Sequence, residues 1–194
     1  MEKQELNNYL LDKQLRQEAM KRISGSFPFT DRMLSEHHRI LDWKEVSGNG
    51  NIGWSVTMIE RWEDYIDWTE FSRNADERIL TPNIIERFKD KWDWKKLSSN
   101  KNVVFTSELI DKYIDRWDWG RLILRLFTHS YYENRSFTEL SSKEFFERYH
   151  EHIPMDNFEN SPLWEYLVDE EQTKIERQLV EENQLNGFQK THRR

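Results

Sequence analysis

WDWKKLSSNKNVVFTSELIDKYIDRWDW, residues 92–119, begins and ends with the same tripeptide, Trp-Asp-Trp. The letters between the two copies indicate a short helix, a turn and a longer helix. The pattern recurs, because Trp43, Trp68, Trp94 and Trp119 follow one another at intervals of 25, 26 and 25 residues. Self-similarity at a short fixed period is typical of stacked helical repeats, in which neighbours cover each other's apolar faces. The sequence therefore predicts an all-α fold, an α-solenoid of short helical-hairpin repeats with capping helices at both ends.

The longer helix of each repeat is predicted to begin after a Ser or Thr, the residue types whose hydroxyl caps a helix N-terminus. The five caps expected on this basis are Thr30, Ser55, Thr81, Thr106 and Ser142. Pro82 supports this phase, since proline suits the first helical position. An apolar residue follows four positions after most caps and an aromatic three positions later, so both are expected on one buried face.

The shorter helix is predicted to begin after the Asp that precedes each repeated Trp. We interpret these carboxylates as helix caps, although a ladder of acids is also a pattern for metal binding or catalysis. The four residues are Asp42, Asp67, Asp93 and Asp118. The Trp and the residue three positions later share a face, which favours a core role over a platform for stacking bases. Asn49, Asn74 and Asn100 end three of these helices, in keeping with the tolerance of Asn for the left-handed conformation.

The chain of 194 residues is long enough for one domain with a core, and we expect a single domain over residues 1–194. Residues 1–28 are predicted to form a capping helix outside the repeats, and about four and a half repeats cover 29–153. Residues 154–194 are expected to hold a last helix, ending near Asn183, and a frayed basic tail. The fourth repeat carries an insertion near 125–139, and such insertions map to one face, often the binding face.

Composition excludes several classes of protein. There is no Cys, so disulfides and thiolate metal sites are excluded and a reducing compartment is favoured. The N-terminus lacks the apolar run of a signal peptide, and no stretch approaches the ~20 apolar residues of a membrane span. These features predict a cytoplasmic protein, in a bacterial or host cell, with no membrane partner.

Charge is concentrated in one segment. The net charge is −7, and residues 139–171 contain ten acids and two bases, a net of −8. This balance argues against a general binder of phosphate backbones, which needs an excess of Lys and Arg. The acidic segment is either a solvated end or a surface that docks onto a basic partner.

Two groups of residues are candidates for protein binding. The insertion and the helix before it carry Tyr, Phe and Arg, and Tyr and Arg are frequent in interface hot spots, although a local mini-core is the alternative. These candidates are Arg121, Arg125, Tyr131, Tyr132, Arg135 and Phe137. The acidic candidates are Glu144, Glu147, Glu151, Glu165, Asp169, Glu170 and Glu171.

The segment Asp93-Trp94-Lys-Lys-Leu97-Ser98-Ser-Asn100 and its copies resemble the short tryptophan-rich "DWxxLSxN" helical repeats of many bacterial and large-virus proteins of unassigned function. The resemblance covers residues 29–153. It implies an α-solenoid used for interaction, and it brings no catalytic residues. The fourth repeat departs from the pattern because Ser and Asn are lost after Leu122.

The sequence favours a non-catalytic protein-interaction module without cofactor or metal. His150 and His152, two positions apart, do not share a helix face and lack a third ligand fixed by spacing. The specific hypothesis is an inhibitor or regulator of a nucleic-acid-handling protein, such as an anti-CRISPR-like counter-defence protein of a phage. One alternative is an intracellular scaffold, and the other is a binder of RNA or single strands. That binder would use Arg121, Arg125, Arg135, Lys190, Arg193 and Arg194.

Overall fold

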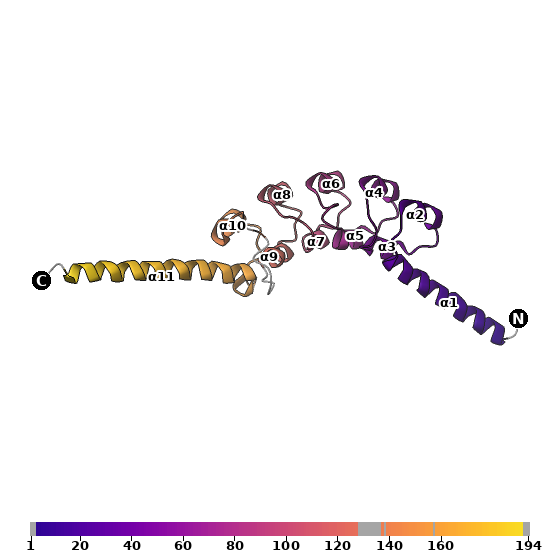
Figure 1. Cartoon of the computed structure of the whole chain (residues 1–194), viewed down its shortest axis with the longest axis horizontal. Helices are drawn as coiled ribbons and strands as arrows, with labels where there is room; N and C mark the ends of the chain where they lie inside the picture. The colour runs from indigo at the N-terminus through magenta and orange to yellow at the C-terminus, as the bar shows by residue number, and fades with distance from the viewer. Residues whose placement is uncertain (1–2, 128–136, 138, 157, 192–194) are drawn as a thin grey trace. The chain divides into compact units, whose positions relative to one another are not determined.

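The computed structural model is built from helices (Figure 1). It describes the backbone of residues 3–127, 137, 139–156 and 158–191, and the side chains of those between residues 8 and 183. Within this part there are no strands, and helices of successive repeats contact one another, which confirms the all-α helical-repeat prediction. The chain divides into two compact units, Met1–Val104 and Phe105–Arg194, here called unit 1 and unit 2. The single domain expected over residues 1–194 stays a prediction.

Unit 1 holds a long first helix and two rows of short helices. Figure 1 shows α2, α4 and α6 in one row and α3, α5 and α7 in the other. Along the second row α1 contacts α3, α3 contacts α5, and α5 contacts α7. The helices of unit 1 are α1 (Lys3–Ser26), α2 (Asp31–His37), α3 (Trp43–Gly48), α4 (Val56–Trp62), α5 (Trp68–Asn74), α6 (Pro82–Arg87) and α7 (Trp94–Leu97).

The predicted caps begin these helices. The hydroxyls of Thr30 and Ser55 accept hydrogen bonds from the third backbone N–H that follows, at 3.3 and 3.2 Å. Thr81 makes no such bond, and Pro82 occupies the first turn of its helix. In the second row, the carboxylate of Asp67 accepts from the N–H of Glu70 at 3.0 Å. Local residue choice thus sets where both kinds of helix start.

The core of unit 1 lies between its two rows of helices. The apolar residue four positions after each cap is fully buried in α2, α4 and α6, and so is the residue three positions after each repeated Trp. These six residues are Leu34, Ile59, Ile85, Val46, Phe71 and Leu97, all at most 1% exposed. Burying each such side chain contributes about 1.5–3 kcal/mol. The repeated Trp residues of unit 1 are only half-buried at the edge of this core.

Each repeated Trp is also tied by a hydrogen bond. The indole N–H of Trp43 donates to the backbone oxygen of His38 at 2.9 Å, and that of Trp94 donates to Lys89 at 2.9 Å. The separation of five residues is the same at Trp68, and in unit 2 at Trp119. Burial at the rim therefore leaves the single polar atom of each ring satisfied.

A serine at the end of each short helix joins neighbouring repeats. The Ser47 hydroxyl donates to the backbone oxygen of Trp43 at 2.6 Å and accepts from the backbone N–H of Asp67 at 2.9 Å. The Ser72 hydroxyl likewise accepts from the N–H of Asp93 at 2.9 Å. Both serines are buried, so each supplies a partner to an N–H that would otherwise lose its hydrogen bond to water.

The asparagines have a different role from the one expected. Asn49 has an extended backbone (φ −79°, ψ 103°), so the predicted left-handed conformation is wrong there. Its buried side-chain amide donates to the backbone oxygens of Ser24 and Phe27, at 2.9 and 2.8 Å. Asn100 does the same in its repeat, reaching the oxygens of residues 72 and 75 at 2.9 and 3.1 Å. These residues tie each repeat to the preceding one. Asn74, at the same register, is exposed and bonds within its own helix.

The first helix belongs to the repeat pattern at its C-terminal end, although it was predicted to lie outside the repeats. Ser24 donates to the oxygen of Met20 at 2.8 Å and accepts from the N–H of Asp42 at 3.0 Å. These are the bonds that Ser47 makes one repeat later. The sequence hides this because no Asp-Trp pair precedes Ser24, and only the last turn of α1 has the repeat geometry.

Unit 2 begins with the same alternation and then departs from it. Its helices are α8 (Ser107–Lys112), α9 (Trp119–Phe127), α10 (Ser142–Tyr149), the 3₁₀ helix η1 (Phe158–Asn160) and α11 (Pro162–Thr191). The cap of α10 is Ser141, one residue before the predicted Ser142. The last helix continues to Thr191, beyond the predicted end near Asn183, so the backbone of 186–191 is helical where fraying was expected.

In unit 2 apolar contacts replace the serine and asparagine bonds. Ile123, buried at 4% exposure, occupies the position of the repeat serine, and α11 packs against both α9 and α10. The core is aromatic, with the ring of Phe145 lying 5.0 Å from that of Phe127 and 4.8 Å from that of Tyr149. A serine bond is not needed here, because α11 packs against α9 in the place that a further Asp-Trp helix would take.

Candidate protein-docking site

The acidic segment divides into acids that build unit 2 and acids that face solvent. Glu144 belongs to the first group: Ser141 and Glu144 form a capping box, with each side chain accepting the backbone N–H of the other. The backbone N–H of Ser141 is the main reason why the pKa of Glu144 lies below its ordinary value. This carboxylate is therefore already engaged in starting α10.

Glu170 also serves the fold. From α11 its carboxylate accepts hydrogen bonds from the backbone N–H groups of Ser142 and Lys143, at 2.7 and 3.1 Å. These N–H groups belong to the first turn of α10, which has no partner within its own helix and carries partial positive charge. Glu170 therefore attaches the two helices to each other. Sequence spacing alone did not separate it from the surface acids, because its partners lie 27 and 28 residues away.

The remaining acidic candidates are exposed. Glu147 lies 3.8 Å from Lys143, and Glu171 lies 3.1 Å from Lys174, in pairs that contribute little because solvent screens them. The other three, Glu151, Glu165 and Asp169, have no ion pair among the residues that the structure describes. The surface around the end of α10 and the first turns of α11 therefore keeps most of its negative charge.

Two further acids of the segment between residues 139 and 171 are exposed and were not among the sequence candidates. Asp156 and Glu159 are exposed in the connection between α10 and α11. Their place in a turn between two predicted helices was the signal that could have identified them. We call the set Glu151, Asp156, Glu159, Glu165 and Asp169 the acidic surface.

The aromatic and Arg candidates are only partly brought together. Phe137 is 1% exposed, with its ring 5.6 Å from that of Phe145, so it belongs to the core and is not available to a partner. Its burial agrees with the mini-core alternative. The Arg121 guanidinium lies 3.4 Å from the Asp118 carboxylate, and Arg125 is half-buried in α9. Tyr131, Tyr132, Arg135 and most of the 125–139 insertion lie outside the described residues, as do the side chains of Lys190, Arg193 and Arg194.

His150 and His152 have structural partners. His152 stacks on Trp119, with ring centroids 5.3 Å apart, and the Nδ1 of His150 lies 3.2 Å from the backbone oxygen of Glu147. Within the described part of the chain, no group of three or more His, Asp or Glu side chains is placed to hold a metal ion. None of the helices in that part combines the length and the apolar character needed to cross a bilayer.

Surface ion pairs also join the longer helices of neighbouring repeats. In unit 1 Arg87 pairs with Glu60, and in unit 2 Arg148 pairs with Asp111.

Comparison with protein-family models, with curated proteins and with solved structures found no match to this chain.

Proposed function

We propose that the protein is a non-catalytic binding module that docks onto a basic protein surface through the acidic surface of unit 2. The observation that carries the proposal is charge segregation: the 139–171 segment has a net charge of −8 in a chain of −7. Exposed like charges oppose one another and gain nothing within the fold, so a partner of opposite charge is the simplest source of compensation. Such complementarity speeds association and selects the partner.

The division of the acids supports this interpretation. Glu144 and Glu170 make directed hydrogen bonds within the fold, whereas the acidic surface makes none that orders a helix. A merely solvated end of the chain has no need for ten acids and two bases over 33 residues. Surfaces for solubility usually mix both signs of charge.

The partner class that this chemistry fits best is a nucleic-acid-handling protein. Such proteins carry basic channels for phosphates, and an array of carboxylates can occupy them in place of a nucleic-acid backbone. A CRISPR nuclease is one member of this class of partners, and the protein would then act as its inhibitor. The repeated Trp residues are not part of the proposal, because their rings pack at the core and their N–H groups are bonded.

The experiment compares partner recovery by three forms of the immobilised protein. The site variant carries Glu151→Gln, Glu165→Gln and Asp169→Asn, and the control carries Asp12→Asn, Asp64→Asn and Glu77→Gln, an equal charge change at exposed positions of unit 1. We expect the wild type and the control to retain a basic partner that the site variant loses. Equal recovery by all three removes the acidic-docking proposal. Retention of RNA or single-stranded DNA by the wild type at low salt favours the nucleic-acid binder instead.

A further inference from the structure

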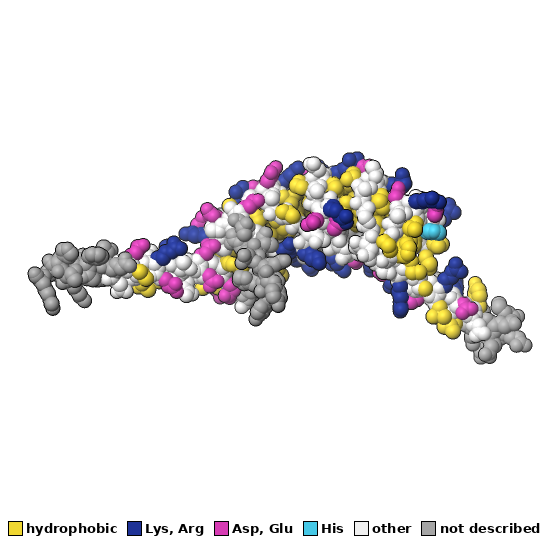
Figure 2. Space-filling model, in the orientation of Figure 1, with side chains coloured by type: hydrophobic (Ala, Val, Ile, Leu, Met, Phe, Trp, Pro, Cys, Tyr) yellow, Lys and Arg dark blue, Asp and Glu magenta, His cyan; other side chains and the backbone are white. Residues whose placement is uncertain are grey.

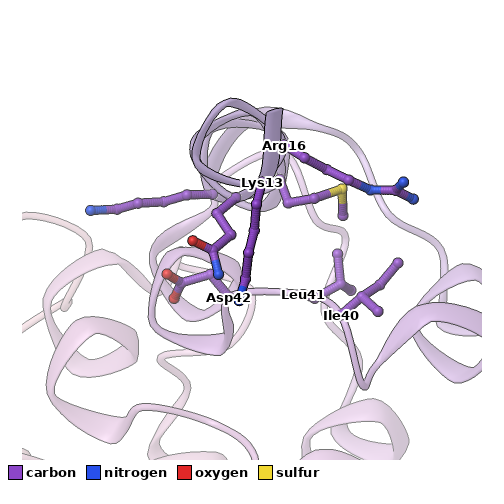
Figure 3. Close-up of a pocket in the computed structure, with 8 residues that line it drawn as sticks. Lys13, Arg16, Ile40, Leu41 and Asp42 are labelled. Atoms are coloured by element: carbon purple, nitrogen blue, oxygen red, sulfur yellow. The ribbon is translucent and has the colours of Figure 1, made fainter. Parts of the chain in front are cut away.

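A groove of about 460 Å³ lies in unit 1 between α1 and the segment that leads into α3. Figure 3 shows Lys13 and Arg16 extending from α1, with Ile40 and Leu41 across from them. Lys13 and Arg16 are exposed and have no ion pair among the described residues. Ile40 is 59% exposed. The groove is therefore basic along one wall and apolar along the other.

The charge of the groove is not cancelled from within. Asp42 also lines it, but its carboxylate accepts the backbone N–H groups of Lys44 and Glu45 as the cap of α3. Lys21, at the inner end, lies 3.6 Å from Glu45. The open part of the groove consequently presents two uncompensated cations beside Ile40. An acidic, apolar helix has the matching chemistry.

The distal half of α11 has that chemistry. Val168, Ile175 and Leu179 are 43–54% exposed and recur at intervals of seven and four residues, so they form one stripe along the helix. Helical spacing places Glu171 and Glu182 beside this stripe and Arg177 on the opposite side, while Lys174 pairs with Glu171 at 3.1 Å. Val168 and Ile175 line a shallow hollow of about 310 Å³ together with Glu171 and Glu176. The described turns of α11 thus place acids on both sides of the apolar stripe.

Neither helix is covered by its own unit at these positions. Residues 8–19 of α1 and 171–183 of α11 are exposed at every position. Figure 2 shows hydrophobic side chains, in yellow, on the visible face of both helices. An isolated helix is marginally stable in water, and most helical stability in proteins comes from packing an apolar face. Both segments therefore gain stability from a partner. Residues 8–19 contain two acids and two bases, and the positive charge of the groove comes from Lys13 and Arg16, whereas residues 171–183 have a net charge of −2.

We propose that the apolar stripe of α11, flanked by Glu171 and Glu182, binds in the basic groove beside α1 of a second copy of this chain. The contact joins two different surfaces, so it is heterologous and produces a closed or an open assembly according to whether the rotation closes. Lys13 and Arg16 face the flanking carboxylates, and Ile40 meets Ile175 or Leu179. The inference goes beyond the proposed function, since it names a second copy and the distal half of α11.

The test is sedimentation of the full chain over a range of concentrations, in ~0.1 M and in ~1 M NaCl, between which the Debye length falls from about 10 Å to about 3 Å. We expect association that increases with protein concentration and weakens in high salt. We expect each of two variants to associate with itself at least about tenfold more weakly than the wild type does. Variant A carries Lys13→Glu and Arg16→Glu, and variant B carries Glu171→Lys and Glu182→Lys. All four residues are exposed, so the circular dichroism of both variants should match that of the wild type.

Mixing the variants gives the sharpest result. Variant A keeps a wild-type α11 and variant B keeps a wild-type groove, so the mixture should form a one-to-one complex that neither forms alone. The matched control is Glu181→Lys, the same change next to Glu182 but on the other side of α11, which should associate as the wild type does. A chain that stays monomeric at every concentration, a mixture that forms no complex, or equal effects of Glu181→Lys and Glu182→Lys would each overturn the proposal. Pull-down of an unrelated partner by the acidic surface would be unaffected by variant A.

Discussion

Unit 1 joins its repeats with buried polar bonds, whereas unit 2 joins its last helices with aromatic packing and one carboxylate. In unit 1, Ser47 and Asn49 each reach a neighbouring repeat through hydrogen bonds. In unit 2, Ile123 stands at the serine position and Glu170 holds the start of α10. The repeat pattern therefore ends where the Ser and Asn hydrogen bonds between repeats end. Beyond that point the helices are held together by other contacts.

The contrast extends to charge. Unit 1 has 18 acids and 17 bases, a net of −1, and unit 2 has 18 acids and 12 bases, a net of −6. In unit 1 several ion pairs join neighbouring repeats, as at Arg87 and Glu60. In unit 2 no acid of the acidic surface pairs with a base among the residues that the structure describes. The regular part of the molecule is therefore built as a scaffold, and the surface that suggests a partner follows the part where the repeat is lost.

The largest expected effect comes from removing a core ring of each unit. Phe145→Ala in unit 2 and Phe71→Ala in unit 1 should each lower the free energy of unfolding by about 3–5 kcal/mol, because both rings are at most 1% exposed. Urea denaturation measures the loss, and hydrogen exchange should show lower protection first in the unit that carries the change. Leu124→Ala, 54% exposed in unit 2, is the control and should cost less than about 1 kcal/mol. A loss of less than about 1 kcal/mol for Phe145→Ala would contradict the aromatic core.

A smaller effect separates two asparagines of the same register. Asn100→Ala should lower the free energy of unfolding by about 2–3 kcal/mol, since the backbone oxygens of Ser72 and Ala75 would lose a buried donor. Asn74→Ala should cost less than about 0.5 kcal/mol, because Asn74 is exposed. Denaturation of both variants under the same conditions makes the comparison. Similar losses for the two would show that the bonds between repeats do not stabilise unit 1.

The serine joint should contribute less than the asparagine joint. Ser47→Ala leaves the backbone N–H of Asp67 without its acceptor and should cost about 1–2 kcal/mol. Ser35→Ala is the matched control: its hydroxyl bonds only within its own helix, at 2.9 Å to the oxygen of Asp31, and it is exposed. The control should change the unfolding midpoint little. Equal shifts for the two variants would show that the Ser47 hydrogen bond does not stabilise the contact between repeats.

The smallest effect is spectroscopic and concerns, in each unit, an aromatic side chain that donates to an Asp of the preceding longer helix. In unit 1 the Trp62 ring N–H donates to Asp31 at 3.0 Å, and in unit 2 the Tyr149 hydroxyl donates to Asp111 at 2.9 Å. Burial, followed by Asp111, raises the pKa of Tyr149 from 10.0 to about 12. Because the folded pKa is above the unfolded one, the stability contributed by neutral Tyr149 is complete below about pH 10 and is lost as pH rises through about 12.

Absorbance titration of tyrosinate checks this expectation. Tyr149 should ionise close to pH 12, and Tyr149→Phe should remove that late step and reduce the fall in stability between pH 10 and 12. Tyr65→Phe, at an exposed position of unit 1, should leave the late step in place. A late step that survives in Tyr149→Phe would assign it to another residue.

The sequence predicted the features that depend on neighbours a few residues away. Helix starts at Thr30, Ser55 and Asp67 were correct because a cap bonds to an N–H two or three positions later. The buried positions followed from helical spacing alone, as Ile59 and Leu97 show. The choice of Ser141 over Ser142 was missed, since both residues are suitable caps and only the carboxylate at Glu144 distinguishes them.

Tertiary structure alone decided the roles that depend on distant partners. Asn49 bonds to residues 22 and 25 positions earlier, Ser24 to one 18 later, and Glu170 to the start of α10. Periodicity shows that such residues recur or cluster, but it does not show which backbone group they will meet. By itself, then, the sequence determined the kind of helix and the face that each buries. Packing determined which polar residues hold the repeats together, which acids remain exposed, and the basic groove beside α1.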